Sequence, residues 1–353
     1  MSRISPPHSF RAIAFWLFAC CALVFAMVVV GGITRLTHSG LSIVEWQPIV
    51  GTIPPLDEGE WAETFAKYQR TPEFRLRNHD MSLAGFKPIF WWEYAHRLLG
   101  RVVGLAFFVP FAYFLARRRI DAPRAWKLAG IFVLGGLQGA LGWYMVKSGL
   151  VDDPRVSSVR LAAHLGLAFL IYASMLWVAL GLLTKPAPAA PAAPRALVRH
   201  SAALAALVFL MVLSGALVAA IKAGYAYNTF PLMNGQWIPE EILIVNPWWM
   251  NLIHNMATVQ FNHRWLAALV ALVAVALWWR VRAQAAASAR AWSHALVAAV
   301  ALQISAGIAT LLLRVPVPLA ALHQSGALIV FTCAIVLLHA LRGGGLHWQG
   351  GEM

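Results

Sequence analysis

Charge is scarce in this sequence. Only 12% of the 353 residues are Asp, Glu, Lys or Arg, whereas 60% are hydrophobic. A soluble domain of this length would carry about twice that charged fraction, so the composition excludes an ordinary soluble protein. Several apolar runs exceed the roughly 18 residues that indicate a membrane-spanning helix. The composition therefore predicts an all-α polytopic membrane protein.

Cysteine and acidic residues are also few. The three cysteines, Cys20, Cys21 and Cys333, all fall within apolar runs, where small buried thiols are expected. They cannot build a disulfide framework. The 28 basic residues outnumber the 14 acidic ones, an excess that would suggest nucleic acid in a soluble protein. In a membrane protein the distribution of this charge indicates orientation instead, and we expect no nucleic-acid partner.

Eight runs have the length and composition of a spanning helix. We expect helices over residues 12–32, 90–115, 126–146, 159–183, 200–222, 256–280, 291–313 and 319–341. The first run is too long for a signal-peptide core and lacks a clear cleavage site, so it counts as a helix. An even number of spans puts both termini on the same side of the membrane.

Basic residues in the short loops set the expected orientation. The loops at 116–127 and 280–290, the linker at 184–199 and both termini are rich in Lys and Arg, and their acids are only Asp121 and Glu352. The positive-inside rule places these segments in the cytoplasm. The long polar segments at 33–89 and 223–255 then lie on the outer face, among the membrane lipids' headgroups and water.

The chain shows signs of an internal duplication. His96-Arg97 recurs as His263-Arg264, and His164 recurs as His323 at a near-equal offset. A Pro/Ala-rich linker at 184–199 separates the copies. We therefore expect two four-helix halves, residues 1–183 and 200–353. Because each half has an even number of spans, the repeat is parallel.

Four histidines lie at matched depth near the outer ends of the inward-running spans: His96, His164, His263 and His323. A single histidine near a helix end is more often a hydrogen-bonded polar residue than a ligand. Four of them, one per inward-running helix and paired by a repeat, favour bis-His sites for haem iron instead. Zinc is less favoured, because two histidines in each half leave its tetrahedron short of ligands.

Glu93 distinguishes the two copies. On a helix it shares one side with His96 and Arg97, which follow it by three and four residues. The second copy has Gln260 at this place, which cannot ionise, so only the N-terminal half offers a carboxylate for chemistry. Arg97 and Arg264 could anchor the helices at the interface. Pairing with haem propionates is favoured over that role, because arginine matches a carboxylate bidentately.

Longer motifs resemble the heme A synthase family over nearly the whole chain. They include GGITRLTHSGLS from Gly31, EWQP from Glu45, GTIPP from Gly51, EYAHRLLGR from Glu93 and YNTFPLMNG from Tyr227. The segment 33–89 lacks the cysteine pair that some bacterial members carry. The chain therefore resembles the proteobacterial and mitochondrial branch, and a thiol-based step cannot be transferred to it.

The resemblance implies an oxidoreductase of the bacterial inner membrane. It would oxidise the C8 methyl group of haem O to a formyl group by two successive hydroxylations, giving haem A for cytochrome oxidase. It implies that His96, His164 and Arg97 bind the substrate haem O, with Glu93 as the catalytic residue. It also implies a resident haem b on His263 and His323. Haem O synthase, the protohaem farnesyltransferase, is the expected partner, and the electron acceptor stays unassigned.

Two other functions fit part of the pattern. A dihaem b-type electron-transfer protein would use all four histidines as permanent ligands, but it does not explain a glutamate in only one half. A parallel-repeat transporter would use the histidines as a proton relay. The absorption spectrum of the purified protein separates these functions, because the transporter would show no haem band.

Overall fold

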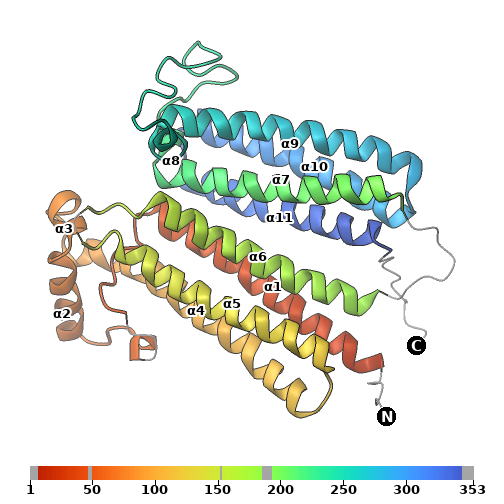
Figure 1. Ribbon diagram of the computed structural model, residues 1–353. Helices are drawn as coiled ribbons and strands as arrows, with labels where there is room; N and C mark the ends of the chain where they lie inside the picture. Colours follow the sequence, from red (N-terminus) through yellow and green to blue (C-terminus); the bar gives the residue numbers. More distant parts are fainter. Residues whose placement is uncertain (1–6, 47–49, 152, 185–192, 344–353) are drawn as a thin grey trace.

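The computed structural model describes residues 7–46, 50–151, 153–184 and 193–343 (Figure 1). Within these ranges the fold is all-helical, and eight helices are long and apolar enough to cross a membrane, which confirms the predicted fold class. They are α1 (Pro7–Leu36), α4 (Leu83–Ala116), α5 (Ala122–Lys147), α6 (Ser158–Leu183), α7 (Arg195–Ala220), α9 (Met256–Gln284), α10 (Ala287–Leu312) and α11 (Val317–Leu341).

Several of these helices are longer than the apolar runs that predicted them. Helix α4 starts at Leu83 rather than near residue 90, because the hydroxyl of Ser82 caps it by accepting a hydrogen bond from the Gly85 N–H. The central part of the predicted linker, residues 185–192, lies outside the described residues.

The helices form two four-membered rings. Helix α1 packs on α4 and α6, and α5 closes the first ring by packing on both. In the second ring, α7 packs on α9 and α11, and α10 joins those two. The rings meet where α1 packs on α11 and α6 packs on α7 and α11 (Figure 1). The two rings have the same helix order, as a parallel repeat would give, and the four helices at the seam are the most enclosed of the eight.

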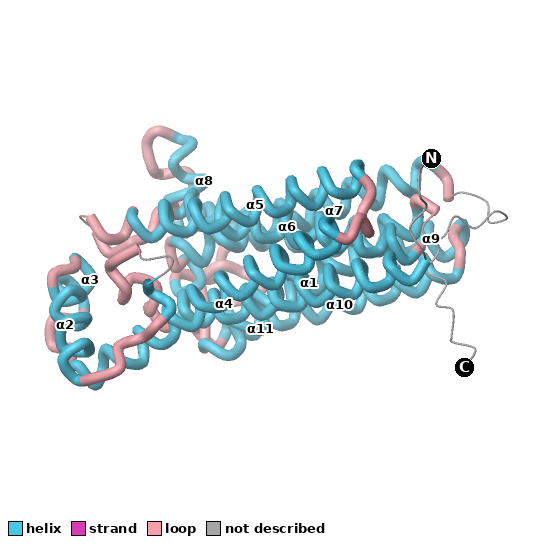
Figure 2. Tube along the Cα trace, turned by 90° about the horizontal axis from the view of Figure 1, so that it is seen from below, coloured by secondary structure: helices cyan, strands magenta, loops and turns pink. Residues whose placement is uncertain are grey.

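The short helices gather at one end of the molecule. Helices α2 (Glu58–Gln69), α3 (Pro72–Arg77) and α8 (Asn251–His254) lie at the end opposite the start of α1 and the end of α11 (Figures 1 and 2). An aromatic cluster of Trp61, Tyr68, Phe86 and Phe90 packs α2 and α3 onto α4. Two short 3₁₀ turns, η2 (Ala223–Tyr225) and η3 (Trp248–Met250), belong to the long segment between α7 and α9.

Most of the remaining core is one apolar cluster that runs through both rings, and a small one of Tyr227, Met233 and Ala257 lies apart from it. Cys20, Cys21 and Cys333 are buried in the large cluster as free thiols, as the sequence predicted. Burial of this kind is expected of small hydrophobic residues rather than reactive ones.

Candidate functional site

Each of the four predicted histidines lies against a glycine of a neighbouring helix. A methyl group built on any of these glycines would come into van der Waals overlap with the Cε1 atom of its histidine. The distances would be 2.8 Å for Gly31 and His96, 2.9 Å for Gly142 and His164, 3.1 Å for Gly215 and His263, and 2.7 Å for Gly307 and His323. Only glycine leaves room for the imidazole at these places. The same contact therefore occurs four times, once on each histidine-bearing helix.

The histidines come together in two pairs, one in each ring. His96 on α4 and His164 on α6 lie within electrostatic range of each other, and so do His263 on α9 and His323 on α11. Among the described residues no cluster of three or more His, Cys, Asp or Glu side chains is arranged to hold a metal ion. A haem iron needs only two axial ligands from the protein, and each pair offers two imidazoles.

Two glutamines hold the partner helices at equivalent places. Gln138 on α5 donates its Nε2–H to the backbone oxygen of His164 (3.0 Å), and Gln303 on α10 donates to the backbone oxygen of His323 (2.8 Å). The amide of Gln138 also lies 3.3 Å from Nε2 of His164. These bonds fix the outer part of each histidine helix against its neighbour.

The two pairs differ at their Nδ1 atoms. In the C-terminal ring, Nδ1 of His263 lies 3.2 Å from the hydroxyl of Ser214, and Nδ1 of His323 lies 3.2 Å from the backbone oxygen of Gln303. A carbonyl only accepts, so the proton of His323 sits on Nδ1 and its Nε2 keeps a free lone pair. In the N-terminal ring, Nδ1 of His96 and of His164 are buried without a hydrogen-bond partner.

Glu93 is buried, with 2% of its surface exposed, and its contacts are with an outer loop. Oε2 accepts hydrogen bonds from the Ser42 hydroxyl (2.7 Å) and the Ile43 N–H (2.8 Å). Oε1 accepts from Nε (3.1 Å) and Nη2 (2.7 Å) of Arg97. The carboxylate thus joins the loop after α1 to helix α4, and the predicted companion His96 is not among its hydrogen-bond partners.

Arg97 and Arg264 bind loop carbonyls in the same manner. Arg97 also donates to the backbone oxygens of Ile43 (2.7 Å) and Glu45 (2.9 Å). Arg264 donates to the backbone oxygen of Tyr227 (2.9 Å) and to Oε1 of Gln260 (2.7 Å), with weaker bonds to two further carbonyls. Each arginine therefore fastens an outer segment to its ring, and their pairing with haem propionates stays a prediction.

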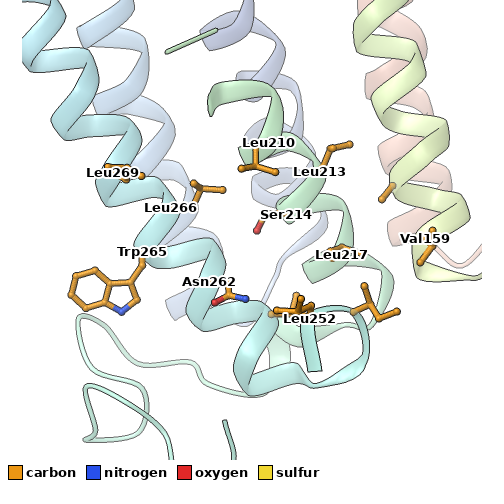
Figure 3. Close-up of a pocket in the computed structure, with 13 residues that line it drawn as sticks. Val159, Leu210, Leu213, Ser214, Leu217, Leu252, Asn262, Trp265, Leu266 and Leu269 are labelled. Carbon is orange, nitrogen blue, oxygen red and sulfur yellow. The ribbon is translucent and has the colours of Figure 1, made fainter. Parts of the chain in front are cut away.

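An apolar pocket of about 620 Å³ lies beside the second histidine pair, between α7 and α9 with α8 at its outer end (Figure 3). Its wall includes Ser214, the partner of His263, together with Leu213, Leu266 and Asn262. Ser214 and Gly215 did not stand out in the sequence, and Gly31 did so only as the first residue of a motif, with no role assigned to it. The two glycines each lie near the outer end of the first helix of a ring, which is the signal that would have found them.

The architecture defines a polytopic membrane protein with a pair of buried histidines in each of two helical rings. The sequence model of one family, described as Cytochrome oxidase assembly protein (COX15-CtaA), matches residues 14–335. A protein named Heme A synthase from Nitrosospira multiformis is 58% identical over 334 residues, which cover 94% of each chain. Those so named from Nitrosomonas eutropha and Rhodospirillum centenum are 52% and 49% identical, covering 92% and 94% of this chain and 92% and 89% of their own.

The chain therefore belongs to the COX15-CtaA family of cytochrome oxidase assembly proteins. This confirms the resemblance to heme A synthases that the outer-loop motifs and the EYAHRLLGR stretch indicated.

Proposed function

We propose that this chain is a heme A synthase, which oxidises the C8 methyl group of haem O to a formyl group through two successive hydroxylations. The observation that carries the proposal is the fourfold contact of a histidine with a glycine. It gives each ring a pair of imidazoles beside backbone that has no side chain, which suits a flat macrocycle between two axial ligands. The buried, unpartnered Nδ1 atoms of His96 and His164 also fit a site whose occupant completes the environment.

The C-terminal ring is the better permanent site. Metal-ligating histidines generally donate their second N–H to a carbonyl, a carboxylate or water, which fixes the ring and raises its basicity. His323 has such a bond to the Gln303 carbonyl, and His263 has the Ser214 hydroxyl. We assign them as the axial ligands of a resident haem b, which would supply one-electron redox chemistry when bound.

The N-terminal ring is the better exchangeable site. His96 and His164 lack the Nδ1 partners that their counterparts have. Packing on Gly31 and Gly142 holds the two imidazoles, and Nε2 of His164 also lies 3.3 Å from the Gln138 amide. A substrate has to enter and leave, and weaker ligands suit that requirement. We assign His96 and His164 as the residues that hold haem O, and Arg97 and Arg264 as candidates for contacts with propionates.

Glu93 is the proposed catalytic residue, since it is the ionisable group that the second ring replaces by Gln260. Its carboxylate already accepts four hydrogen bonds, so it also holds the Ser42–Ile43 segment on α4. A fixed negative charge at this place would stabilise positive charge that develops at the edge of the substrate, or accept a proton there.

The location and partners follow from the same proposal. We place the protein in the bacterial inner membrane with both termini in the cytoplasm, and the ends of the rings that carry α2, α3 and α8 on the outer side. The halves 1–183 and 200–353, joined by the linker 184–199, would serve substrate and resident haem respectively. Haem O synthase, the protohaem farnesyltransferase, would deliver the substrate.

The test is extraction and chromatography of haems from cells that make haem O, with and without this protein. Haem A should be present only with the protein. Replacement of His323 by Ala should weaken the low-spin haem b spectrum or make it high-spin. Unchanged haem O with no haem A in the presence of folded protein would refute the proposal.

A dihaem electron carrier is the second candidate, because all four histidines make the same contact with a glycine. It predicts a fixed two haems b per chain in the purified protein, with no haem O or haem A recovered. A heme A synthase instead yields haem O or haem A from the same preparation.

A further inference from the structure

A cluster of basic side chains lies on the outer side of the seam between the two rings. We call Arg35, His38, Arg77 and Lys222 the outer cationic cluster. They come from the end of α1, the turn after it, the end of α3 and the residue just before η2. Nζ of Lys222 lies 3.5 Å from Nε2 of His38. Burial lowers the pKa of Lys222, and the guanidinium groups of Arg77 and Arg35 lower it further.

The cluster has one carboxylate beside it, and that carboxylate does not neutralise it. Glu73 on α3 is 3% exposed, and its Oε2 is buried without a hydrogen-bond partner. Burial raises the pKa of Glu73 to about 7, even though Arg77 and Lys222 act in the opposite direction. In the part of the chain that the structure describes, none of the three cations Arg35, Arg77 and Lys222 forms an ion pair. The cluster therefore carries uncompensated positive charge.

One member of the cluster, Arg35, lies near the N-terminal histidine pair. Arg35 follows Gly31 by four residues on α1, so it is on the same face about 6 Å further out. Gly31 is the glycine that lies against His96. Nη2 of Arg35 crosses the seam and donates to the backbone oxygens of Ala219 and Ala220 (both 2.9 Å), while its Nε is buried without a partner. Arg35 thus lies about one turn along α1 from the glycine that contacts His96.

We propose that the outer cationic cluster binds the propionate carboxylates of the haem held by His96 and His164. This inference rests on the proposed function. Propionates are the ionised groups of a haem, and a site for them at the membrane surface has to supply matching charge. Arg97, which follows His96 directly, is already bound to Glu93 and to loop carbonyls, whereas Arg35, Arg77 and Lys222 form no ion pair among the described residues. A phosphate of a lipid headgroup would have the same charge chemistry, so the test separates the two sources.

The test compares protohaem with its dimethyl ester, in which the carboxylates are neutral. Protein in a neutral detergent, with its resident haem retained, is titrated with a second equivalent of either compound and followed by difference absorption. The wild type should bind the free acid about tenfold or more tightly than the ester, since hydrogen bonds to charged groups are stronger than neutral ones. In the double variant Lys222→Gln, Arg77→Gln the ratio should fall towards one. Arg35 is left unchanged because it also binds the end of α7.

The matched control is Arg155→Gln. Arg155 is an exposed outer-face arginine whose partner is Asp153, so its loss should leave the ratio unchanged. Equal binding of acid and ester by the wild type would overturn the inference while leaving the proposed function intact. A second haem that does not bind at all, or that binds equally well to His96→Ala, would remove the proposed function as well.

A second arm addresses lipid. The wild-type titration is repeated in micelles that contain phosphatidylglycerol. A preference for the free acid that persists supports a propionate site. A preference that disappears, while haem still binds, assigns the outer cationic cluster to lipid phosphate and overturns the inference.

Discussion

Replacement of Glu93 by Gln tests the proposed catalytic residue. The structure shows that this change disturbs hydrogen bonds as well as removing the ionisable group. Every partner of the carboxylate donates: the Ser42 hydroxyl, the Ile43 N–H and two N–H groups of Arg97. An amide has one oxygen and one NH₂ group. Its NH₂ must therefore face either Ile43 or Arg97, and in each case two donors point at one another.

The cost can be worked from these contacts. A hydrogen bond to a charged group contributes about 1.5–3 kcal/mol, and leaving a buried donor unsatisfied costs about 1–3 kcal/mol. We expect Glu93→Gln to weaken the attachment of the Ser42–Glu45 segment to α4 by roughly 2–3 kcal/mol. We also expect haem to bind in both rings, and haem A production to fall strongly with accumulation of haem O or a hydroxylated intermediate.

Arg97→Gln is the control that separates the two roles. It breaks the same attachment, because Arg97 also binds the Ile43 and Glu45 carbonyls, but it keeps the carboxylate. Limited proteolysis of the outer segment reports the attachment, and haem chromatography reports the product. If both variants expose the segment and lose haem A to the same extent, Glu93 is a structural residue. Loss of haem A in Glu93→Gln well beyond that in Arg97→Gln supports the catalytic role.

Three further predictions concern the glycine contacts, the outer helices and the orientation. Gly307→Ala should perturb the low-spin haem b spectrum, because its methyl would lie 2.7 Å from a ring atom of His323, whereas Gly130→Ala, which has open space, should not. Glu73 has a folded-state pKa of about 7 against an ordinary 4.5, so the folded state binds its proton more tightly. Thermal stability should therefore fall as pH rises from about 4.5 to above 7, and Glu73→Gln should flatten that dependence. Reporter fusions in the linker 184–199 should read cytoplasmic and those near Gly59 periplasmic, and the reverse pattern would overturn the orientation.

The sequence predicted the spans and the histidine pairs, because both depend on local patterns. Runs of apolar residues mark a helix in lipid whatever it packs against. The depth of a histidine in the membrane follows from its position within such a run. His96 could therefore be placed at the level of His164 before the packing of the helices was known. The start of α4 was missed because its first turns are not apolar and depend on the Ser82 cap.

Contacts across long stretches of chain could not be read from the sequence. Arg97 binds a carboxylate, as expected, but it is that of Glu93, and the Nε and Nη2 groups both donate to the single oxygen Oε1. Arg97 also donates to the carbonyls of Ile43 and Glu45, about fifty residues earlier. Likewise the sequence shows Gly215 but not the imidazole that lies against it. Such contacts depend on which face of each helix meets its neighbour, and helix periodicity alone leaves that open when nearly every face is apolar.

The exchange of Glu93 for Gln260 has a second physical reason besides chemistry. At the first position the loop presents donors, Ser42 and the Ile43 N–H, so the helix residue has to accept on both oxygens. At the second position the loop presents an acceptor, because Nε2 of Gln260 donates to the Ala223 carbonyl (2.6 Å). A carboxylate therefore fits the first environment and an amide fits the second. Gln260 therefore does not show that the N-terminal ring would accept an amide, and Gln260→Glu should weaken its own loop by placing a carboxylate against a carbonyl.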